Sequence, residues 1–116
     1  MRPDERRKSL RATVDIFVEI RGAERTALHP ATDLSTTGLY LLASDDHGAL
    51  DPTQPLDLEL TLPTNVVIRA RATIAYIDDR FGQRGIGLEF SDLSAHDKLA
   101  IERFVDASSA AQRQLG

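Results

Sequence analysis

Apolar and polar residues alternate with a period of two along much of this chain, which is typical of β-strands that have one solvated face. The pattern is clearest in residues 12–20 and 56–62, where every second residue is aliphatic. Other apolar segments predict further strands at residues 25–34, 39–43, 66–77 and 85–90. Pro30 interrupts the first of these, which suggests an edge or bulge position there, because proline cannot donate to a sheet ladder.

The period changes near the C-terminus, where apolar residues recur at the spacing of an α-helix. Ser94 is followed three residues later by Asp97, which is the spacing of a capping box at a helix N-terminus. The apolar stripe that follows consists of Leu99, Ala100, Ile101, Phe104 and Val105. We therefore expect a helix over about residues 95–107 that covers one mouth or face of the sheet, with residues 108–116 either fraying or extending it.

The strands, the turns between them and the helix together predict the fold class. About six strands at short spacing followed by one helix indicate a mainly β fold, a small six-stranded antiparallel (split) β-barrel with a C-terminal α-helix. A chain of 116 residues is long enough for one domain, and its 41% hydrophobic content argues against disorder throughout. We expect a flexible basic arm over residues 1–11, the barrel and helix over residues 12–107, and a tail over residues 108–116.

Composition excludes several classes of function. The chain contains no cysteine, which rules out disulfides, thiolate metal sites and cysteine nucleophiles. Its three histidines lie in different segments without metal-binding spacing, and the sequence contains neither a phosphate-binding P-loop nor a nucleophile elbow. No apolar run reaches the roughly 18–20 residues that span a bilayer, and no secretory signal is visible. We therefore expect a cytoplasmic protein that is not an enzyme, uses no metal or cofactor and has no membrane partner.

The net charge of −4 is unevenly distributed along the chain. Residues 1–11 contain five basic and two acidic residues, whereas the remainder contains nine basic and sixteen acidic residues. A basic arm on an acidic body has three interpretations: it clamps an anion, it contacts nucleic acid, or it lies back on its own acidic surface. The acidic body argues against binding of long nucleic acids, for which a broad basic face is expected.

Two short motifs suggest a specific chemistry. Arg7 and Arg11 form the pattern R-x-x-x-R, and Asp33, Ser35 and Gly38 form the pattern D-x-S-x-x-G. Guanidinium groups bind phosphates and the O6 and N7 atoms of guanine, whereas a carboxylate accepts hydrogen bonds from N1–H and N2–H2 of the same base. Each motif alone has a plain alternative, because arginines occur in solvated charge runs and Asp, Ser and Gly are ordinary turn residues. Together they predict a site for a guanine nucleotide that carries phosphate.

This pair of motifs resembles the signature of the PilZ domain family. A third element is similar as well, since residues 85–90 read G-I-G-L-E-F and match the late G-x-G-x-x-F strand of that family. The resemblance covers residues 7 to 90, and it implies a six-stranded barrel with a C-terminal helix that binds the bacterial second messenger cyclic di-GMP. By this resemblance, Arg7 and Arg11 are the two motif arginines that engage a guanine Hoogsteen edge or a phosphate.

The resemblance also implies roles for the neighbouring positions. Arg6 precedes the first motif arginine, and an arginine there tends to accompany binding of two stacked nucleotides in the family. Asp33 would accept from a guanine Watson–Crick edge, and Ser35 would either donate to the base or hold the turn through a local hydrogen bond. Gly38 would allow a positive φ or a close backbone approach to the ligand. Thr37 departs from the family pattern, which often has a second glycine there.

The expected function is that of a single-domain receptor. Cyclic di-GMP would order the N-terminal arm, and the altered surface would then contact an unidentified effector protein in motility, biofilm or related regulation. The main alternative is a PilZ-like protein-interaction scaffold that does not bind nucleotide. Nucleic-acid binding through the arm is a second, less favoured rival, and the sequence leaves open whether the protein is a monomer or a homodimer.

Overall fold

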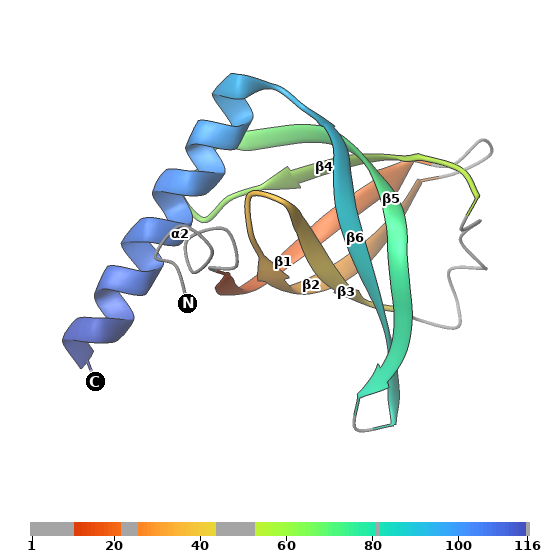
Figure 1. The fold of residues 1–116 in the computed structure, drawn as a ribbon, viewed down its shortest axis with the longest axis horizontal. Coiled ribbons are helices and arrows are strands. Elements are labelled where there is room, and N and C mark those ends of the chain that lie inside the picture. Colours follow the sequence, from red (N-terminus) through yellow and green to blue (C-terminus); the bar gives the residue numbers. More distant parts are fainter. Residues whose placement is uncertain (1–10, 22–25, 44–52, 81, 116) are drawn as a thin grey trace, which may run out of the picture.

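The computed structural model describes residues 11–21, 26–43, 53–80 and 82–115, and it describes side chains as far as residue 108. Figure 1 shows a strongly curved sheet with one helix lying across its end. Within the described ranges the elements are β1 (Ala12–Arg21), β2 (Thr26–Leu34), β3 (Gly38–Leu42), β4 (Leu56–Thr61), β5 (Val67–Arg80), β6 (Gln83–Leu93) and α2 (Ala95–Leu115). Of the expected N-terminal arm, Arg11 is the residue that falls within these ranges.

The strands close into a barrel in the order β1-β2-β3-β6-β5-β4, and each neighbouring pair is antiparallel. This confirms the predicted fold class, a six-stranded antiparallel barrel with a C-terminal helix. The ladder between β2 and β3 begins at Ala31, so Pro30 pairs with Phe17 of β1 and lies just outside the second ladder. The proline therefore occupies an edge-like position although the sheet as a whole is closed.

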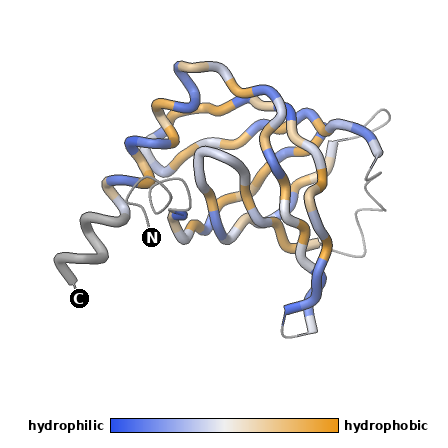
Figure 2. Tube along the Cα trace, viewed as in Figure 1, coloured by the Kyte–Doolittle hydropathy of each residue, from blue (hydrophilic) through white to orange (hydrophobic). Residues whose placement is uncertain are grey.

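The alternation in the sequence becomes the inside and outside of the barrel. Val18 and Ile20 of β1 are buried and pair directly with Leu60 and Leu58 of β4, which are buried as well. Figure 2 shows the resulting alternation of hydrophobic and hydrophilic residues along the strands. Burial of each such side chain contributes about 1.5–3 kcal/mol, and a shift of one residue would turn the whole set outward. The hydrophobic pattern thus fixes the register of the sheet.

The hairpin of β5 and β6 is longer than the sequence predicts. β5 continues to Arg80, which pairs with Gln83 at the start of β6, whereas β4 pairs with β5 only as far as Ala72. Figure 1 shows the far end of this hairpin projecting beyond the rest of the barrel. A bulge interrupts the β5–β6 ladder between Ile74 and Tyr76, where the pairing shifts by one residue. The bulge changes which β5 side chains face outward near the end of the barrel.

Helix α2 begins with the cap that the sequence predicts. The backbone N–H of Asp97 donates to Ser94 Oγ at 3.0 Å, and the Asp97 carboxylate accepts the backbone N–H of Arg69 in β5 at 3.3 Å. Ile101 and Val105 are buried in the barrel core. The helix continues through residues 108–115, so this part of the predicted tail extends the helix. The cap and the two buried side chains fix α2 across one end of the barrel (Figure 1).

Candidate ligand-binding site

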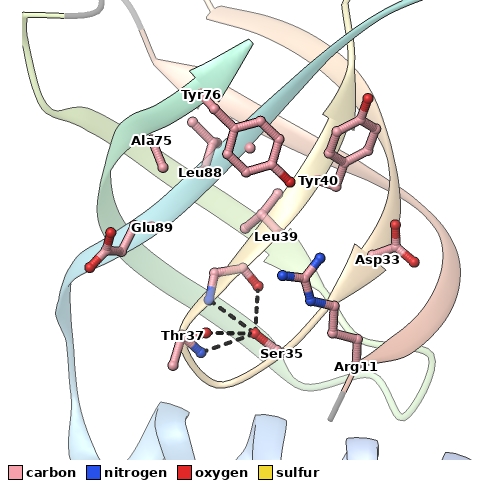
Figure 3. A pocket seen from close by; sticks show the side chains of 12 residues that line it. Arg11, Asp33, Ser35, Thr37, Leu39, Tyr40, Ala75, Tyr76, Leu88 and Glu89 are labelled. Atoms are coloured by element: carbon pink, nitrogen blue, oxygen red, sulfur yellow. Dashed lines mark hydrogen bonds between the residues drawn. The ribbon is translucent and has the colours of Figure 1, made fainter. Parts of the chain in front are cut away.

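A cavity of about 310 Å³ lies on the outer face of the barrel, between the turn that joins β2 to β3 and the adjoining parts of β3, β5 and β6. This volume falls at the lower end of the range of about 300–1,000 Å³ that is typical of small-molecule sites. Arg11, Asp33, Ser35 and Gly38 all line it. The fold therefore brings together the described members of the two sequence motifs (Figure 3).

Ser35 organises the turn at one side of the cavity. Its side chain is buried, and its Oγ accepts the backbone N–H groups of Thr37 and Gly38, both at 3.2 Å. The Ser35 backbone N–H donates to the carbonyl oxygen of Gly38 at 2.9 Å, which closes the turn. Of the two roles considered for this hydroxyl, holding the turn is the one that the structure displays.

Gly38 allows a close approach to a neighbouring strand. A Cβ atom on this residue would overlap the carbonyl oxygen of Leu88 in β6. Its φ does not lie in the left-handed region, which among the described glycines is occupied by Gly82. Of the two reasons considered for a glycine here, a positive φ does not apply, and the close approach that the structure displays is to the β6 backbone. Since Phe90 N–H also donates to the Thr37 carbonyl at 2.8 Å, the turn is held firmly against β6.

Arg11 and Asp33 line the cavity where β1 begins and β2 ends. Asp33 pairs with Thr13 at the start of β1, and Arg11 directly precedes that strand. The Asp33 side chain is half-buried, and one carboxylate oxygen accepts the hydroxyl of Thr32 at 3.3 Å. Figure 3 shows the Arg11 guanidinium group pointing into the space between the Ser35 turn and the aromatic side chains above it. A cationic fork and a carboxylate acceptor thus face the same cavity. Arg6 and Arg7 lie outside the described residues.

Two tyrosines form the aromatic wall of the cavity, and the sequence motifs did not identify either of them. Tyr40 and Tyr76 have ring centroids 6.3 Å apart, with an angle of 32° between the ring planes. The Tyr40 hydroxyl donates to Asp78, and the guanidinium carbon of Arg80 lies 4.2 Å from the Tyr40 ring centroid. Burial and the adjacent Asp78 carboxylate raise the pKa of Tyr40 to about 12. The phenol is therefore neutral near pH 7 and serves as a hydrogen-bond donor.

The glycines of β6 make room for these rings. A Cβ on Gly85 would overlap the Tyr40 hydroxyl, and a Cβ on Gly87 would overlap the ring of Tyr76. The two glycines therefore serve close packing within the barrel. Two features of the sequence relate to this aromatic wall: the G-x-G pattern of Gly85 and Gly87, and the presence of only two tyrosines in the chain. The pattern did not reveal which side chains fill the space beside the glycines.

The described charges at the cavity do not favour an anion by themselves. Among the described residues that line it, Arg11 is the cation, and Asp33 and Glu89 are the carboxylates. A ligand with two phosphates would therefore need further positive charge close to this site. Among the described residues, no cluster of histidine and acidic side chains is suited to hold a metal ion. Within the described residues, no helix combines the length and the apolar character that crossing a membrane requires.

Comparison with known proteins places this geometry in a family context. Residues 5–107 match the PilZ domain. No curated protein matches the chain by sequence. Among solved structures, the chain is similar to the Bacillus subtilis inhibitor of motility MotI (DgrA), with 22% identity and a TM-score of 0.76. That similarity covers 91% of this chain but 50% of the MotI chain, so the present chain spans about half of MotI.

Two other structures show the same fold. The PilZ domain of Escherichia coli YcgR, solved with cyclic di-GMP, has 18% identity and a TM-score of 0.74, with 90% of this chain and 92% of that chain covered. MrkH of K. pneumonia in its apo state has 16% identity and a TM-score of 0.71, with 92% and 52% covered. The structural likeness establishes the shared barrel, and the family match extends over both motifs and the first part of α2. This chain belongs to the PilZ domain family.

Proposed function

We propose that this chain is a receptor that binds cyclic di-GMP at the cavity on the outer face of the barrel. The observation that carries the proposal is the convergence of Arg11, Asp33, Ser35 and Gly38 on one cavity, although the two motifs are well separated in the sequence. Membership of the PilZ family supports the same ligand, and two structures of YcgR with similar folds contain cyclic di-GMP.

The chemistry of the two motifs divides recognition between them. The Arg11 guanidinium group offers paired donors to the O6 and N7 atoms of a guanine or to a phosphate. Asp33 offers acceptors to N1–H and N2–H2, which adenine does not present in the same arrangement. Ser35 and Gly38 hold the turn that places this wall of the site against β6. Guanine selectivity in this proposal comes mainly from Asp33.

The charge of the cavity supports a role for the preceding arginines. Arg11 faces Asp33 and Glu89 among the described lining residues, so it cannot alone neutralise two phosphates. Arg6 and Arg7 come shortly before Arg11 in the sequence and are the cations closest to it along the chain apart from Lys8. In this proposal they supply the missing charge, and Arg6 favours a second, stacked nucleotide.

In this proposal, the domain transmits ligand binding to an effector protein through contacts at its surface. In the proposed mechanism, the arm closes over the cavity when Arg6, Arg7 and Arg11 bind the ligand, and this closure changes the surface that an effector protein meets. The chain acts by binding and not by catalysis, and its place of action is the cytoplasm. The closure requires a difference in ligand affinity between the open and closed arm, which those arginines supply.

Isothermal titration calorimetry with cyclic di-GMP tests this proposal. Wild-type protein should bind the ligand, Arg11→Ala should bind it more weakly, and Asp33→Ala should lose discrimination against cyclic di-AMP. A good bidentate contact contributes about 1–3 kcal/mol. Arg11→Ala should therefore lower the affinity for cyclic di-GMP by about 5- to 150-fold, and Asp33→Ala should lower the preference for cyclic di-GMP over cyclic di-AMP by a similar factor. Arg103→Ala is the matched control, because Arg103 is exposed on α2 and does not line the cavity.

The outcomes separate the candidate functions. If the wild-type protein produces no binding heat at micromolar cyclic di-GMP, the proposal fails and a protein-interaction scaffold becomes the better account. If the arm instead binds generic oligonucleotides with a steep dependence on salt, and Asp33→Ala leaves that binding unchanged, nucleic-acid binding is favoured.

A further inference from the structure

We propose that an exposed apolar patch on the outer face of β1 and β2 is the docking surface for a basic segment of the effector protein. The patch consists of Phe17, Leu28 and Pro30, and we call it the β1–β2 patch. The inference rests on the proposed function, because it names the surface and the chemistry of the partner in that relay. None of its three residues lines the ligand cavity.

The register of the first ladder brings the three side chains of the patch together. Phe17 pairs directly with Pro30, and Leu28 lies two residues before Pro30 on the same face of β2. Residues at such diagonal positions are about 7–8 Å apart, which is within reach of an aromatic ring. Phe17 is 63% exposed and Leu28 is 53% exposed, the two highest values among the large hydrophobic residues that the structure describes. Neither side chain belongs to the barrel core.

A carboxylate borders the patch without a neighbour that neutralises it. Glu19 of β1 pairs with Leu28 of β2 on one side and with Glu59 of β4 on the other. Two like charges therefore lie opposite each other, an arrangement that destabilises a sheet. Glu59 is ion-paired with Arg69 at 2.8 Å and with Arg21 at 3.5 Å. Glu19 forms no ion pair with any described residue, so its charge is left for a partner.

A second carboxylate lies on the other side of the phenylalanine. Asp15 is exposed on β1 two residues before Phe17, and across the described ranges it too forms no ion pair. Phe17 thus lies between Asp15 and Glu19 along the strand. Exposed apolar patches with a polar rim mark interaction sites. A segment that carries Lys or Arg beside an apolar side chain complements both features, and this complementarity identifies the occupant.

The β1–β2 patch lies on the same ladder as one wall of the ligand cavity. Asp33 lines the cavity and pairs with Thr13, and Phe17 follows four residues later on β1. At about 3.3 Å per residue, the two places are about 13 Å apart. A segment docked on the patch therefore lies beside Arg11, where the arm joins the barrel. Arm closure over the ligand adds contacts to that segment, so cyclic di-GMP and the partner should strengthen each other's binding.

A short synthetic peptide of leucine and lysine residues is the probe for this surface, and a peptide of leucine and glutamate is its matched control. Fluorescence anisotropy should show that wild-type protein binds the lysine peptide and not the glutamate peptide. Phe17→Ala and Glu19→Lys should each weaken that binding by about tenfold. Added salt should weaken it further in wild type, and saturating cyclic di-GMP should strengthen it.

Two variants of α2 control for general changes of the surface. Leu99→Ala removes an apolar side chain that is 45% exposed, and Glu102→Lys changes the net charge as Glu19→Lys does. Both should bind the lysine peptide as wild type does. Glu19→Lys replaces a like-charge pair with Glu59 by an opposite-charge pair, so its midpoint in urea should be no lower than that of wild type.

NMR of the full wild-type chain locates the peptide without any variant. Amide signals that move when the lysine peptide is added should gather on β1 and β2 around Phe17 and Leu28. Shifts that gather elsewhere would overturn the assignment. If Phe17→Ala moves the amide signals of residues 1–10 in the free protein, the receptor's own arm occupies the patch. If Phe17→Ala instead abolishes a dimer seen by sedimentation velocity, a second copy occupies it. Either result overturns the assignment to a partner.

The remaining outcomes separate this inference from the proposed function. If wild-type protein binds cyclic di-GMP but does not prefer the lysine peptide, or if Phe17→Ala and Glu19→Lys bind that peptide as well as wild type does, the docking surface is wrong and the receptor function stands. Equal peptide affinity with and without cyclic di-GMP would overturn the link between the patch and the relay. If wild-type protein binds the lysine peptide at the patch but never binds cyclic di-GMP, the receptor function fails and the docking surface stands.

Discussion

Replacing Ser35 by alanine tests how the turn beside the cavity is held. Ser35 Oγ accepts two backbone N–H groups at 3.2 Å, from Thr37 and from Gly38. Thr37 is exposed, so its amide can bond to water once the hydroxyl is removed. Gly38 is buried against β6, and its amide would lose its partner in a place that water does not reach easily. The cost of Ser35→Ala is therefore dominated by one buried donor.

An unsatisfied buried donor costs about 1–3 kcal/mol. For a chain of 116 residues, each kcal/mol lowers the melting temperature by about 4 °C, so Ser35→Ala should melt about 4–12 °C below wild type. Circular dichroism measures both melting curves. Ser91→Ala is the matched control, since it removes the same atom from an exposed position on β6 and should change stability by less than about 0.5 kcal/mol.

The comparison of the two serines decides the interpretation. If Ser35→Ala lowers the melting temperature no more than Ser91→Ala does, the hydroxyl does not hold the turn and its role must be sought in contact with the ligand. A large loss of stability together with weaker ligand binding is the expected result, because the turn carries one wall of the site.

Three further predictions concern Tyr40 and two residues of β6, Gly85 and Glu89. Because the pKa of Tyr40 is raised to about 12 from its usual value near 10, the stability it contributes is complete below pH 10 and is lost as the pH rises toward 12. Wild-type protein should therefore lose more stability over that interval in urea titrations than Tyr40→Phe does, and equal losses would contradict this. Gly85→Ala should destabilise the protein by about 1–3 kcal/mol, because the new Cβ overlaps the Tyr40 hydroxyl, and an unchanged midpoint in urea would refute the close packing. Glu89→Gln should strengthen cyclic di-GMP binding at low ionic strength and have less effect at high salt, as measured by calorimetry, whereas weaker binding would mean that Glu89 contacts the base.

The barrel was predictable because its signals are local. Alternation in residues 12–20 and 56–62 requires only a period of two, and one solvated face then fixes which side chains enter the core. The cap at Ser94 is likewise a signal of a few residues, and it begins the helix where expected. The helix end was less certain, because neither glycine nor proline occurs in residues 108–115.

The aromatic wall was not predictable because it depends on pairing between distant strands. Tyr40 and Tyr76 meet only because β3 and β5 both pair with β6 on either side of Gly87, and because a bulge shifts the β5 register by one residue. The role of Gly38 also depends on β6, whose backbone approaches it closely. The D-x-S-x-x-G motif located the turn, but the neighbours of the turn follow from topology.

An amide-detected NMR titration of the full chain with cyclic di-GMP tests the central claim most directly. The largest shifts should fall on Arg11, on the turn from Ser35 to Gly38 and on Tyr76, which surround one cavity. Shifts that instead gather on the ion-paired face of Glu59 and Arg69, or spectra that do not change with added ligand, would contradict it.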